Sequence, residues 1–251
     1  MGLLSPAGLA IVSHRANGGE YPENTLLGIE AALSDGVDAI EIDVRATSDD
    51  ALMLLHDADL RRVARDPRTV LSMTREDLGA LRVLDPHRRH DPQPVPTLDD
   101  AFEAIAGRAA IVVDFVDLAL IDPIIAAVNE AGAAAWTWFT PHEPAVALKL
   151  RAGCPEARVF LGWSHTEWYA HSPTDAVALA ERLGLTGIMA NHRSIDRTTV
   201  EYAHSRGLAV ACWTVNEPRR MGTLARLGVD AITTDYPRTL LGVLRHLGLR
   251  P

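Results

Sequence analysis

Eight short apolar segments, separated by longer segments with helical spacing, constrain the fold of this chain most strongly. Strands that alternate with helices in this way are typical of an α/β fold with a parallel sheet. Eight strand–helix units in 251 residues predict a single-domain (β/α)8 barrel, a TIM barrel, that spans residues 1–251. The expected strands are residues 8–13, 38–44, 109–114, 133–139, 157–163, 187–191, 208–214 and 230–235.

A ninth apolar segment, ALMLLHD at residues 51–57, does not fit the parallel pattern. Too few residues separate it from the strand at 38–44 for a parallel crossover, which needs roughly ten or more. We expect it to be the return arm of a hairpin that turns at residues 48–50. The stretch 58–107 is rich in Arg, Asp, His and Pro, and it is expected to form a small inserted lobe after this arm rather than a separate domain.

The charged residues exclude some classes of partner. The net charge is −9, which argues against nucleic acid, because proteins that bind it usually present a basic face. The sequence contains 23 arginines and one lysine, Lys149, so phosphate or carboxylate groups must be bound mainly by arginine, backbone or metal. We expect a small-molecule substrate and no nucleic acid. The sequence gives no oligomeric state.

The cysteines and the apolar segments bear on location. Cys154 and Cys212 form no C-x-x-C pair, so neither a zinc ribbon nor a disulfide framework is indicated. No basic region precedes the first apolar run, and no apolar stretch reaches the roughly 18 residues of a membrane span. These features predict a cytoplasmic protein without an integral membrane segment.

Acidic side chains and histidines gather at the predicted strand ends. In TIM barrels, catalytic groups project from the C-terminal ends of the strands. His14 follows the first strand, Glu41 and Asp43 share one face of the second, His56 ends the hairpin arm and Asp114 ends the third strand. Carboxylates suit hard cations such as Mg²⁺ or Ca²⁺, and histidines can move protons. Each residue alone could be an ordinary interior or surface residue, so this interpretation depends on their common location.

The ordered motifs resemble the glycerophosphodiester phosphodiesterase family. From residue 14 to residue 57 the chain carries H-R, P-E-N-T, E-x-D, T-x-D and H-D in that order, and VPTLDDAF resembles the family's stretch before the third strand. The closing W-T-V-N and T-D-x-P elements are also similar. The resemblance implies a TIM barrel that hydrolyses deacylated phospholipid diesters, such as glycerophosphocholine, to glycerol phosphate and an alcohol.

The resemblance also implies roles for residues. His14 and His56 would be the general acid–base pair, Glu41 and Asp43 metal ligands, and Arg15 a phosphate contact. In the mechanism proposed for the family, the glycerol 2-hydroxyl attacks phosphorus while one histidine takes its proton. The other histidine protonates the leaving alcohol, and water then opens the cyclic phosphate. The implied cofactor is a divalent metal ion, Mg²⁺ or Ca²⁺, with Mn²⁺ as a further candidate.

Four positions depart from the family pattern. The third strand of the family usually ends E-x-K, whereas this chain has Asp114 and Val116 at those positions. An aspartate can still bind a cation with a shorter reach, so Asp114 is the expected third metal ligand, but Val116 carries no charge. Ala16 replaces the glycine of H-R-G, and Trp138 replaces a small residue after the fourth strand.

Other residues are candidates for the charge that Val116 lacks and for the pocket wall. Arg45 shares a face with the acidic pair by alternation and is a candidate phosphate contact, as is Arg193, with a solvent-exposed arginine as the alternative. Trp213 is expected to contact substrate or simply to pack. Asp57 is expected either to orient His56 or to point elsewhere, and Glu23 and Asn24 are expected to brace the first loop. His192 is a weak candidate for the pocket. The histidines other than His14, His56 and His192 are expected on the surface.

Three functions remain open from the sequence. The first is a metal-dependent phosphodiesterase that hydrolyses glycerophosphodiester-like substrates to a phosphomonoester and an alcohol. The second is a lyase or transferase that stops at a cyclic phosphate, which Val116, Ala16 and Trp138 motivate. The third is a non-catalytic barrel that binds a phosphoryl ligand, against which the retained pair of histidines counts.

Overall fold

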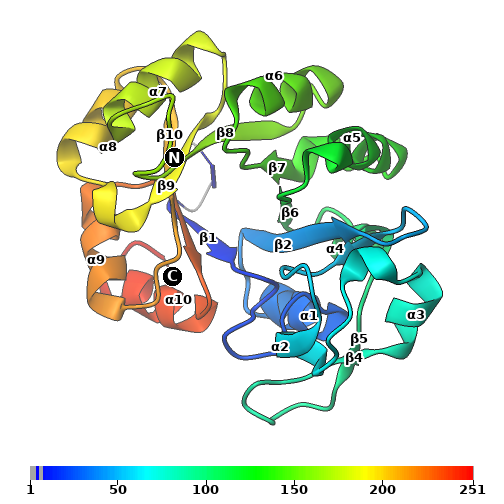
Figure 1. Ribbon diagram of the computed structural model, residues 1–251. Helices are drawn as coiled ribbons and strands as arrows, with labels where there is room; N and C mark the ends of the chain where they lie inside the picture. Colours follow the sequence, from blue (N-terminus) through cyan, green and yellow to red (C-terminus); the bar gives the residue numbers. More distant parts are fainter. Residues whose placement is uncertain (1–3, 6–7, 251) are drawn as a thin grey trace.

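Eight parallel strands form a closed barrel in the computed structural model, which describes residues 4–5 and 8–250 (Figure 1). The barrel strands run in the order β1, β11, β10, β9, β8, β7, β6 and β2, and β1 pairs with β2 to close it. Seven of the eight strands fall within the segments expected from the sequence, and β2 runs two residues beyond its expected end, which confirms the TIM barrel. Their bounds are β1 Ala10–Ser13, β2 Ala39–Ala46, β6 Ala110–Asp114, β7 Thr137–Phe139, β8 Arg158–Trp163, β9 Gly187–Asn191, β10 Ala209–Trp213 and β11 Ala231–Thr234.

The ninth apolar segment forms β3, Leu52–Leu54, which pairs antiparallel with the end of β2. Val44 lies opposite Leu54 and Ala46 opposite Leu52. The hairpin expected from the short connection is therefore confirmed. It carries the chain past the rim of the barrel and leaves His56 close to the end of β2.

Helices pack around the outside of the barrel. They bury their apolar faces against the outward-facing strand residues, such as Ile42 and Ile111, in the largest cluster of buried hydrophobic residues. Several helices have clear start signals: α4 begins with a capping box at Thr97, and others have proline in the first turn. The helices that follow barrel strands or the hairpin are α1 Leu26–Ser34, α4 Leu98–Ile105, α5 Ile121–Glu130, α6 Pro144–Gly153, α7 Pro173–Arg182, α8 Arg197–His204, α9 Pro218–Leu227 and α10 Pro237–His246.

A second cluster fills the barrel interior. Two large side chains, Trp138 of β7 and Phe160 of β8, pack at 5.6 Å between ring centroids among small residues of other strands. Residues 134–136, expected as strand, instead form a short 3-10 helix that leads into β7. Arg158, the first residue of β8, lies over the Trp138 ring, so this ring lies toward the end of the barrel opposite the rim.

The inserted lobe is smaller than the sequence suggested. It contains α2 Arg61–Ala64, α3 Arg75–Ala80 and the paired strands β4 Arg82–Val83 and β5 Gln93–Pro94, around a small core that includes Leu60. Figure 1 shows it in cyan on the side of the barrel where β2 lies. The expected lobe of 58–107 also included α4, which packs against α1 in the ring of barrel helices.

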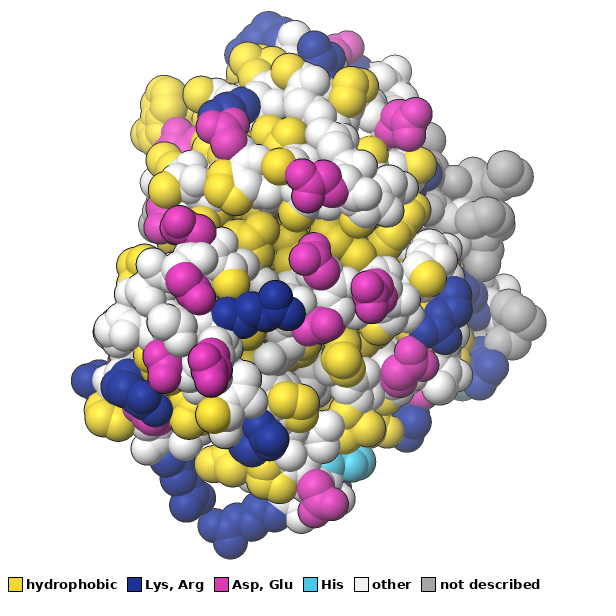
Figure 2. All heavy atoms as spheres, turned by 90° about the vertical axis from the view of Figure 1, so that its right-hand side faces the viewer, with side chains coloured by type: hydrophobic (Ala, Val, Ile, Leu, Met, Phe, Trp, Pro, Cys, Tyr) yellow, Lys and Arg dark blue, Asp and Glu magenta, His cyan; other side chains and the backbone are white. Residues whose placement is uncertain are grey.

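The surface carries charges of both signs. On the face that Figure 2 shows, acidic side chains in magenta and cationic side chains in dark blue are interspersed with hydrophobic and uncharged ones. Within the part of the chain that the structure describes, no helix is long and apolar enough to span a membrane.

Candidate active site

A pocket with a volume of about 240 Å³ opens at the C-terminal ends of the barrel strands. It brings together seven of the eight site residues predicted from the sequence: His14, Arg15, Glu41, Asp43, His56, Asp114 and Trp213. Its other lining residues are Val112, Thr140, His142, Met189, Thr214 and Thr233. The residues come from several strands that are far apart in the sequence, as catalytic sites of TIM barrels do.

Three carboxylates form the floor of this pocket. Asp43 of β2 lies opposite Asp114 of β6 in the sheet register, and Glu41 precedes Asp43 on the same inward face. One oxygen of each carboxylate lies within 4.8 Å of the others. Burial raises the pKa of Glu41 above its usual value, and the charge of Asp43 raises it further. The same two causes, in the same order, raise the pKa of Asp114.

This donor set fits a divalent cation. The three oxygens are close enough to share one ion, and the groups are partly buried with too little positive charge to balance them. The raised pKa values of Glu41 and Asp114 express the cost of that imbalance, which a bound cation would remove. The cluster can therefore hold a metal ion.

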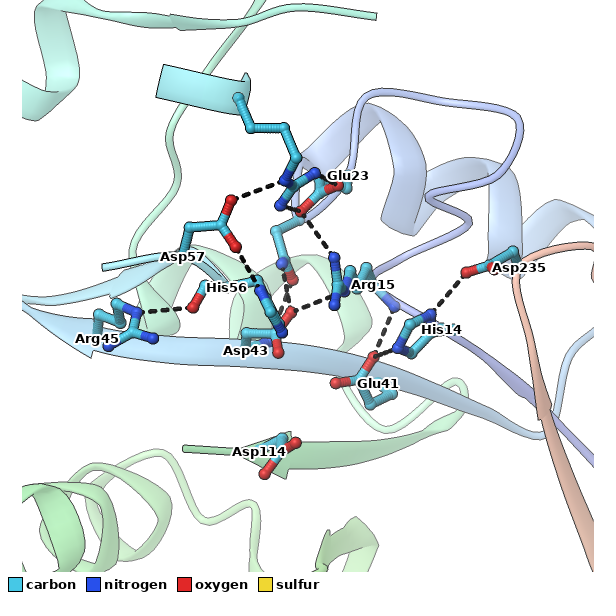
Figure 3. A network of polar contacts seen from close by, with 12 residues as sticks. His14, Arg15, Glu23, Glu41, Asp43, Arg45, His56, Asp57, Asp114 and Asp235 are labelled. Atoms are coloured by element: carbon cyan, nitrogen blue, oxygen red, sulfur yellow. Dashed lines mark hydrogen bonds and ion pairs between the residues drawn. The ribbon is translucent and has the colours of Figure 1, made fainter. Parts of the chain in front are cut away.

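His14 is held by a carboxylate that the sequence analysis did not assign. Its Nδ1 lies 2.6 Å from Oδ1 of Asp235, which follows β11, and its Nε2 lies 3.9 Å from Oε2 of Glu41 (Figure 3). Because a carboxylate only accepts, Nδ1 carries the proton and Nε2 faces Glu41. Burial lowers the pKa of His14, but the charges of Glu41 and Asp235 outweigh it, so the net shift is upward. The T-D-x-P motif contained Asp235 without revealing its partner.

His56 is held in the same way by its sequence neighbour. Its Nδ1 lies 2.6 Å from Oδ1 of Asp57, so the alternative in which Asp57 points elsewhere does not apply. Arg62 of α2 donates from Nε to Asp57 at 2.7 Å. Burial opposes ionisation of Asp57, but the hydrogen bonds from Arg62 and His56 outweigh it and lower the pKa of Asp57 to about 2. The lobe thus orients the second histidine.

Arg15 lies between the first loop and the carboxylates. Its backbone N–H donates to Glu41 at 2.6 Å, and its guanidinium lies 3.4 Å from Glu23 and 3.6 Å from Asp43. Asn24 donates from Nδ2 to Asp43 at 2.7 Å and accepts from the Asp43 backbone N–H. Glu23 and Asn24 therefore brace the loop and orient its neighbours, as the sequence suggested.

The first loop turns sharply through left-handed conformations. Arg15, Ala16 and Asn17 have φ of 48°, 52° and 67°. Ala16 stands where the resembling family has glycine, and it adopts the conformation that glycine tolerates best. Gly28 of α1 is needed beside it, because a Cβ there would lie 2.1 Å from the Ala16 carbonyl oxygen. Ala16 is fully buried and is absent from the pocket lining.

Arg45, a candidate phosphate contact from the sequence, does not line the main pocket. It faces inward by alternation, but β6 ends opposite Asp43, so Arg45 lies beyond the rim, where β2 pairs with β3. There the Nε of Arg45 donates to the His56 carbonyl oxygen at 2.7 Å. The Arg45 side chain lines a neighbouring cavity of about 200 Å³ instead of the main pocket. Val116 is 75% exposed and also lies outside the pocket.

His142 was expected on the surface, and its side chain is indeed 46% exposed, but its place in the pocket lining was not foreseen. It follows β7 and lines the pocket together with Asp114 and Trp213. The sequence around it, TPHEP, belongs to none of the motifs described above, and a histidine in a loop has no alternation pattern that reveals its direction.

The chain is similar to known proteins over most of its length. Residues 14–239 match the model of the Glycerophosphoryl diester phosphodiesterase family. The chain belongs to this family. As a member it is a phosphoric diester hydrolase, and the resemblance drawn from the motifs is confirmed.

Two known proteins are similar to this chain over almost its whole length. A glycerophosphodiester phosphodiesterase from Caldanaerobacter subterraneus is 23% identical over 95% of this chain and 98% of its own. A Silicibacter pomeroyi structure, provisionally described as a glycerophosphoryl diester phosphodiesterase, has a TM-score of 0.86 and 26% identity over 99% of this chain and 97% of that one.

A third protein shares the fold at lower identity. A phosphodiesterase from Oleispira antarctica, solved in complex with the product sn-glycerol-3-phosphate, has a TM-score of 0.79 and is 22% identical. The alignment covers 94% of this chain and 96% of that one.

Proposed function

We propose that this family member hydrolyses glycerophosphodiester-like small molecules to a phosphomonoester and an alcohol, with His14 and His56 as the acid–base pair. The observation that carries the proposal is the matched arrangement of the two histidines. Each imidazole has a carboxylate at 2.6 Å from Nδ1, which fixes its tautomer, and each lines the pocket that contains the three clustered carboxylates.

Glu41, Asp43 and Asp114 would hold one divalent cation, Mg²⁺ or Ca²⁺, with Mn²⁺ as a third candidate. Their oxygens suit hard cations, and the raised pKa values of Glu41 and Asp114 favour an ion that offsets their charge. A cation bound there supplies stabilisation of negative charge on the non-bridging oxygens of the diester.

The side chains of this chain perform the remaining steps. One histidine takes the proton of the glycerol 2-hydroxyl as this oxygen attacks phosphorus, and the other gives a proton to the leaving alcohol oxygen. Arg15, oriented by Glu23 and Asp43, contacts the phosphate. Trp213 forms part of the wall of the pocket. Water then opens the cyclic phosphate, with the two histidines exchanging roles.

The alternative functions lose their support. The lyase hypothesis depended on Val116, Ala16 and Trp138, and all three lie outside the lining of the pocket. A binding protein has no need for two histidines that are each oriented by a carboxylate. We further propose that the chain works as one domain in the cytoplasm, and both statements stay predictions.

The direct test is turnover of a panel of glycerophosphodiesters with Mg²⁺, Ca²⁺ or Mn²⁺, followed by phosphorus NMR. Wild-type protein should release a phosphomonoester, and His14→Ala and His56→Ala should each lower kcat by at least 100-fold. His246→Ala, at the exposed end of α10, is the matched control and should leave kcat unchanged. No turnover by the metal-loaded wild type on the whole panel would refute the proposal, and a persistent cyclic phosphate would favour the lyase.

A further inference from the structure

His142 lines the active-site pocket, and its ring is held by contacts with neighbouring residues. It lies in the loop between β7 and α6, and its ring packs edge-on against Trp213 with 6.4 Å between the centroids. Both residues line the pocket with Asp114, which ends the neighbouring strand β6. The proposed function gives His142 no role.

A carboxylate fixes the orientation of this ring. Nδ1 of His142 lies 2.7 Å from Oε1 of Glu167, which belongs to the segment after β8. The Glu167 side chain is largely buried, and Ser164 donates to the same oxygen. Because Glu167 accepts, Nδ1 carries the proton and Nε2 is the nitrogen left for a ligand. His142 thus has the same kind of partner as the proposed acid–base pair.

The neighbouring strand is shaped to admit the ring. A Cβ at Gly162 of β8 would lie 2.8 Å from Cδ2 and 2.9 Å from Nε2 of His142, so a larger residue would displace the imidazole. Gly162 also donates its backbone N–H to the Pro141 carbonyl at 2.8 Å, and its own carbonyl accepts from the Tyr169 hydroxyl. These contacts fix the loop that carries His142, although the side chain itself is 46% exposed.

The pocket has few positive groups for a phosphate. Among the described lining residues, Arg15, His14, His56 and His142 are those that can carry positive charge. The guanidinium of Arg15 is shared between Glu23 and Asp43, and two of the histidines move protons in the proposed mechanism. Val116 supplies no cation. His142 is the remaining group: when its ring carries two protons, Nδ1–H is donated to Glu167 and Nε2–H is left for a phosphoryl oxygen.

We propose that His142, positioned by Glu167, donates its Nε2–H to a phosphoryl oxygen of the bound substrate and product. This inference rests on the proposed function, because it gives the same pocket a further phosphoryl contact. A hydrogen bond between an imidazolium and a phosphoryl oxygen is charge-assisted and therefore stronger than one between neutral groups. His142 is then a catalytic residue, and Glu167 is a positioning residue.

The test is calorimetric titration of Mg²⁺-loaded protein with inorganic phosphate and, separately, with sn-glycerol-3-phosphate. In His142→Ala, both ligands should bind about tenfold more weakly. His142→Lys should recover most of the affinity because it restores a cation. Glu167→Gln should weaken phosphate binding several-fold and raise the KM for a diester by the same factor, with kcat changed less than KM.

Two comparisons keep the result interpretable. His246→Ala should bind both ligands as the wild type does, and the unfolding midpoint of each variant shows whether it folds. Gly162→Ala should reproduce part of the loss, because it displaces the ring without removing it. Titration measures binding, so it tests this inference even if the wild type fails to turn over any diester and the proposed function is refuted.

Three outcomes would overturn the inference. The first is wild-type phosphate affinity in folded His142→Ala. The second is a loss of affinity for sn-glycerol-3-phosphate with unchanged affinity for inorganic phosphate, which would assign His142 to the glycerol hydroxyls. The third is a His142→Lys variant that binds no better than His142→Ala, which would show that positive charge is not what His142 supplies.

Discussion

The three clustered carboxylates lead to a prediction about stability, metal and pH. Because burial and mutual repulsion raise the pKa values of Glu41 and Asp114, these two groups bind more protons in the metal-free folded chain than in the unfolded chain above about pH 4.5. Their contribution to the free energy of unfolding therefore falls as the pH rises from that value through the raised pKa values. A divalent cation should reverse this loss, and its effect should be large at pH 8 and small at pH 5.

The distances give the size of the effect. Two unit charges 4.8 Å apart repel each other by about 3 kcal/mol at an effective dielectric constant of about 20. Asp114→Asn removes one of the charges, so it should raise the stability of the metal-free protein at pH 8 by about 1–3 kcal/mol. A cation at 100 times its Kd adds about 2.7 kcal/mol. For a chain of this length, that corresponds to an increase in Tm of about 5–10 °C.

Differential scanning calorimetry provides the assay. The wild type and Asp114→Asn are compared at pH 5 and pH 8, with EDTA and with Mg²⁺, Ca²⁺ or Mn²⁺. We expect the cation to raise the Tm of the wild type at pH 8 and to lose most of this effect in Asp114→Asn. Glu130→Gln, an exposed change at the end of α5, is the matched control for loss of one negative charge. The reasoning is refuted if no cation shifts the wild-type Tm at pH 8, or if metal-free Asp114→Asn is less stable there than the wild type.

Three further predictions concern the groups around the pocket. Asp235→Asn removes the carboxylate that helps to raise the pKa of His14, so kcat/KM should fall about 100-fold. The limb of the pH–rate profile that reports His14 should move to lower pH, and an unchanged profile would contradict this. Arg62→Ala removes a partner of Asp57 and should raise the pKa of Asp57 from about 2, which carbon-detected NMR measures. In the wild type, the stability that ionised Asp57 contributes is lost as the pH falls through this lowered pKa. Val116→Lys should change kcat/KM less than twofold, because Val116 lies outside the pocket; a tenfold change in steady-state assays would show that position 116 reaches the substrate.

Residues on regular strands could be predicted well from the sequence. Glu41, Asp43 and Asp114 follow the alternation of β2 and β6, so their inward direction follows from the position of each in its strand. The same rule failed for Arg45, because alternation gives a face and does not show where the neighbouring strand ends. Composition likewise did not show where the lobe ends, because α4 lies inside the stretch 58–107 yet packs against α1 in the ring of barrel helices.

Two loop residues at the site could not be predicted, although the motif residues His14 and His56, which also lie outside the strands, were. Asp235 and His142 both line or support the site, but their positions depend on tertiary contacts with residues far away in the sequence. Glu167 became visible only through its hydrogen bond to His142. The identity of such partners depends on loop geometry, which no periodic pattern in the sequence encodes.

The double contact of Arg62 has a consequence for how this barrel can change. Arg62 belongs to the lobe, yet it donates to Glu23 in the first loop and to Asp57 beside His56. The lobe is therefore not a free accessory that can be exchanged between relatives to alter substrate choice. A grafted lobe without an arginine at this place would leave two carboxylates of the rim without their shared partner, so chimeras should keep this residue even where the rest of the insertion is replaced.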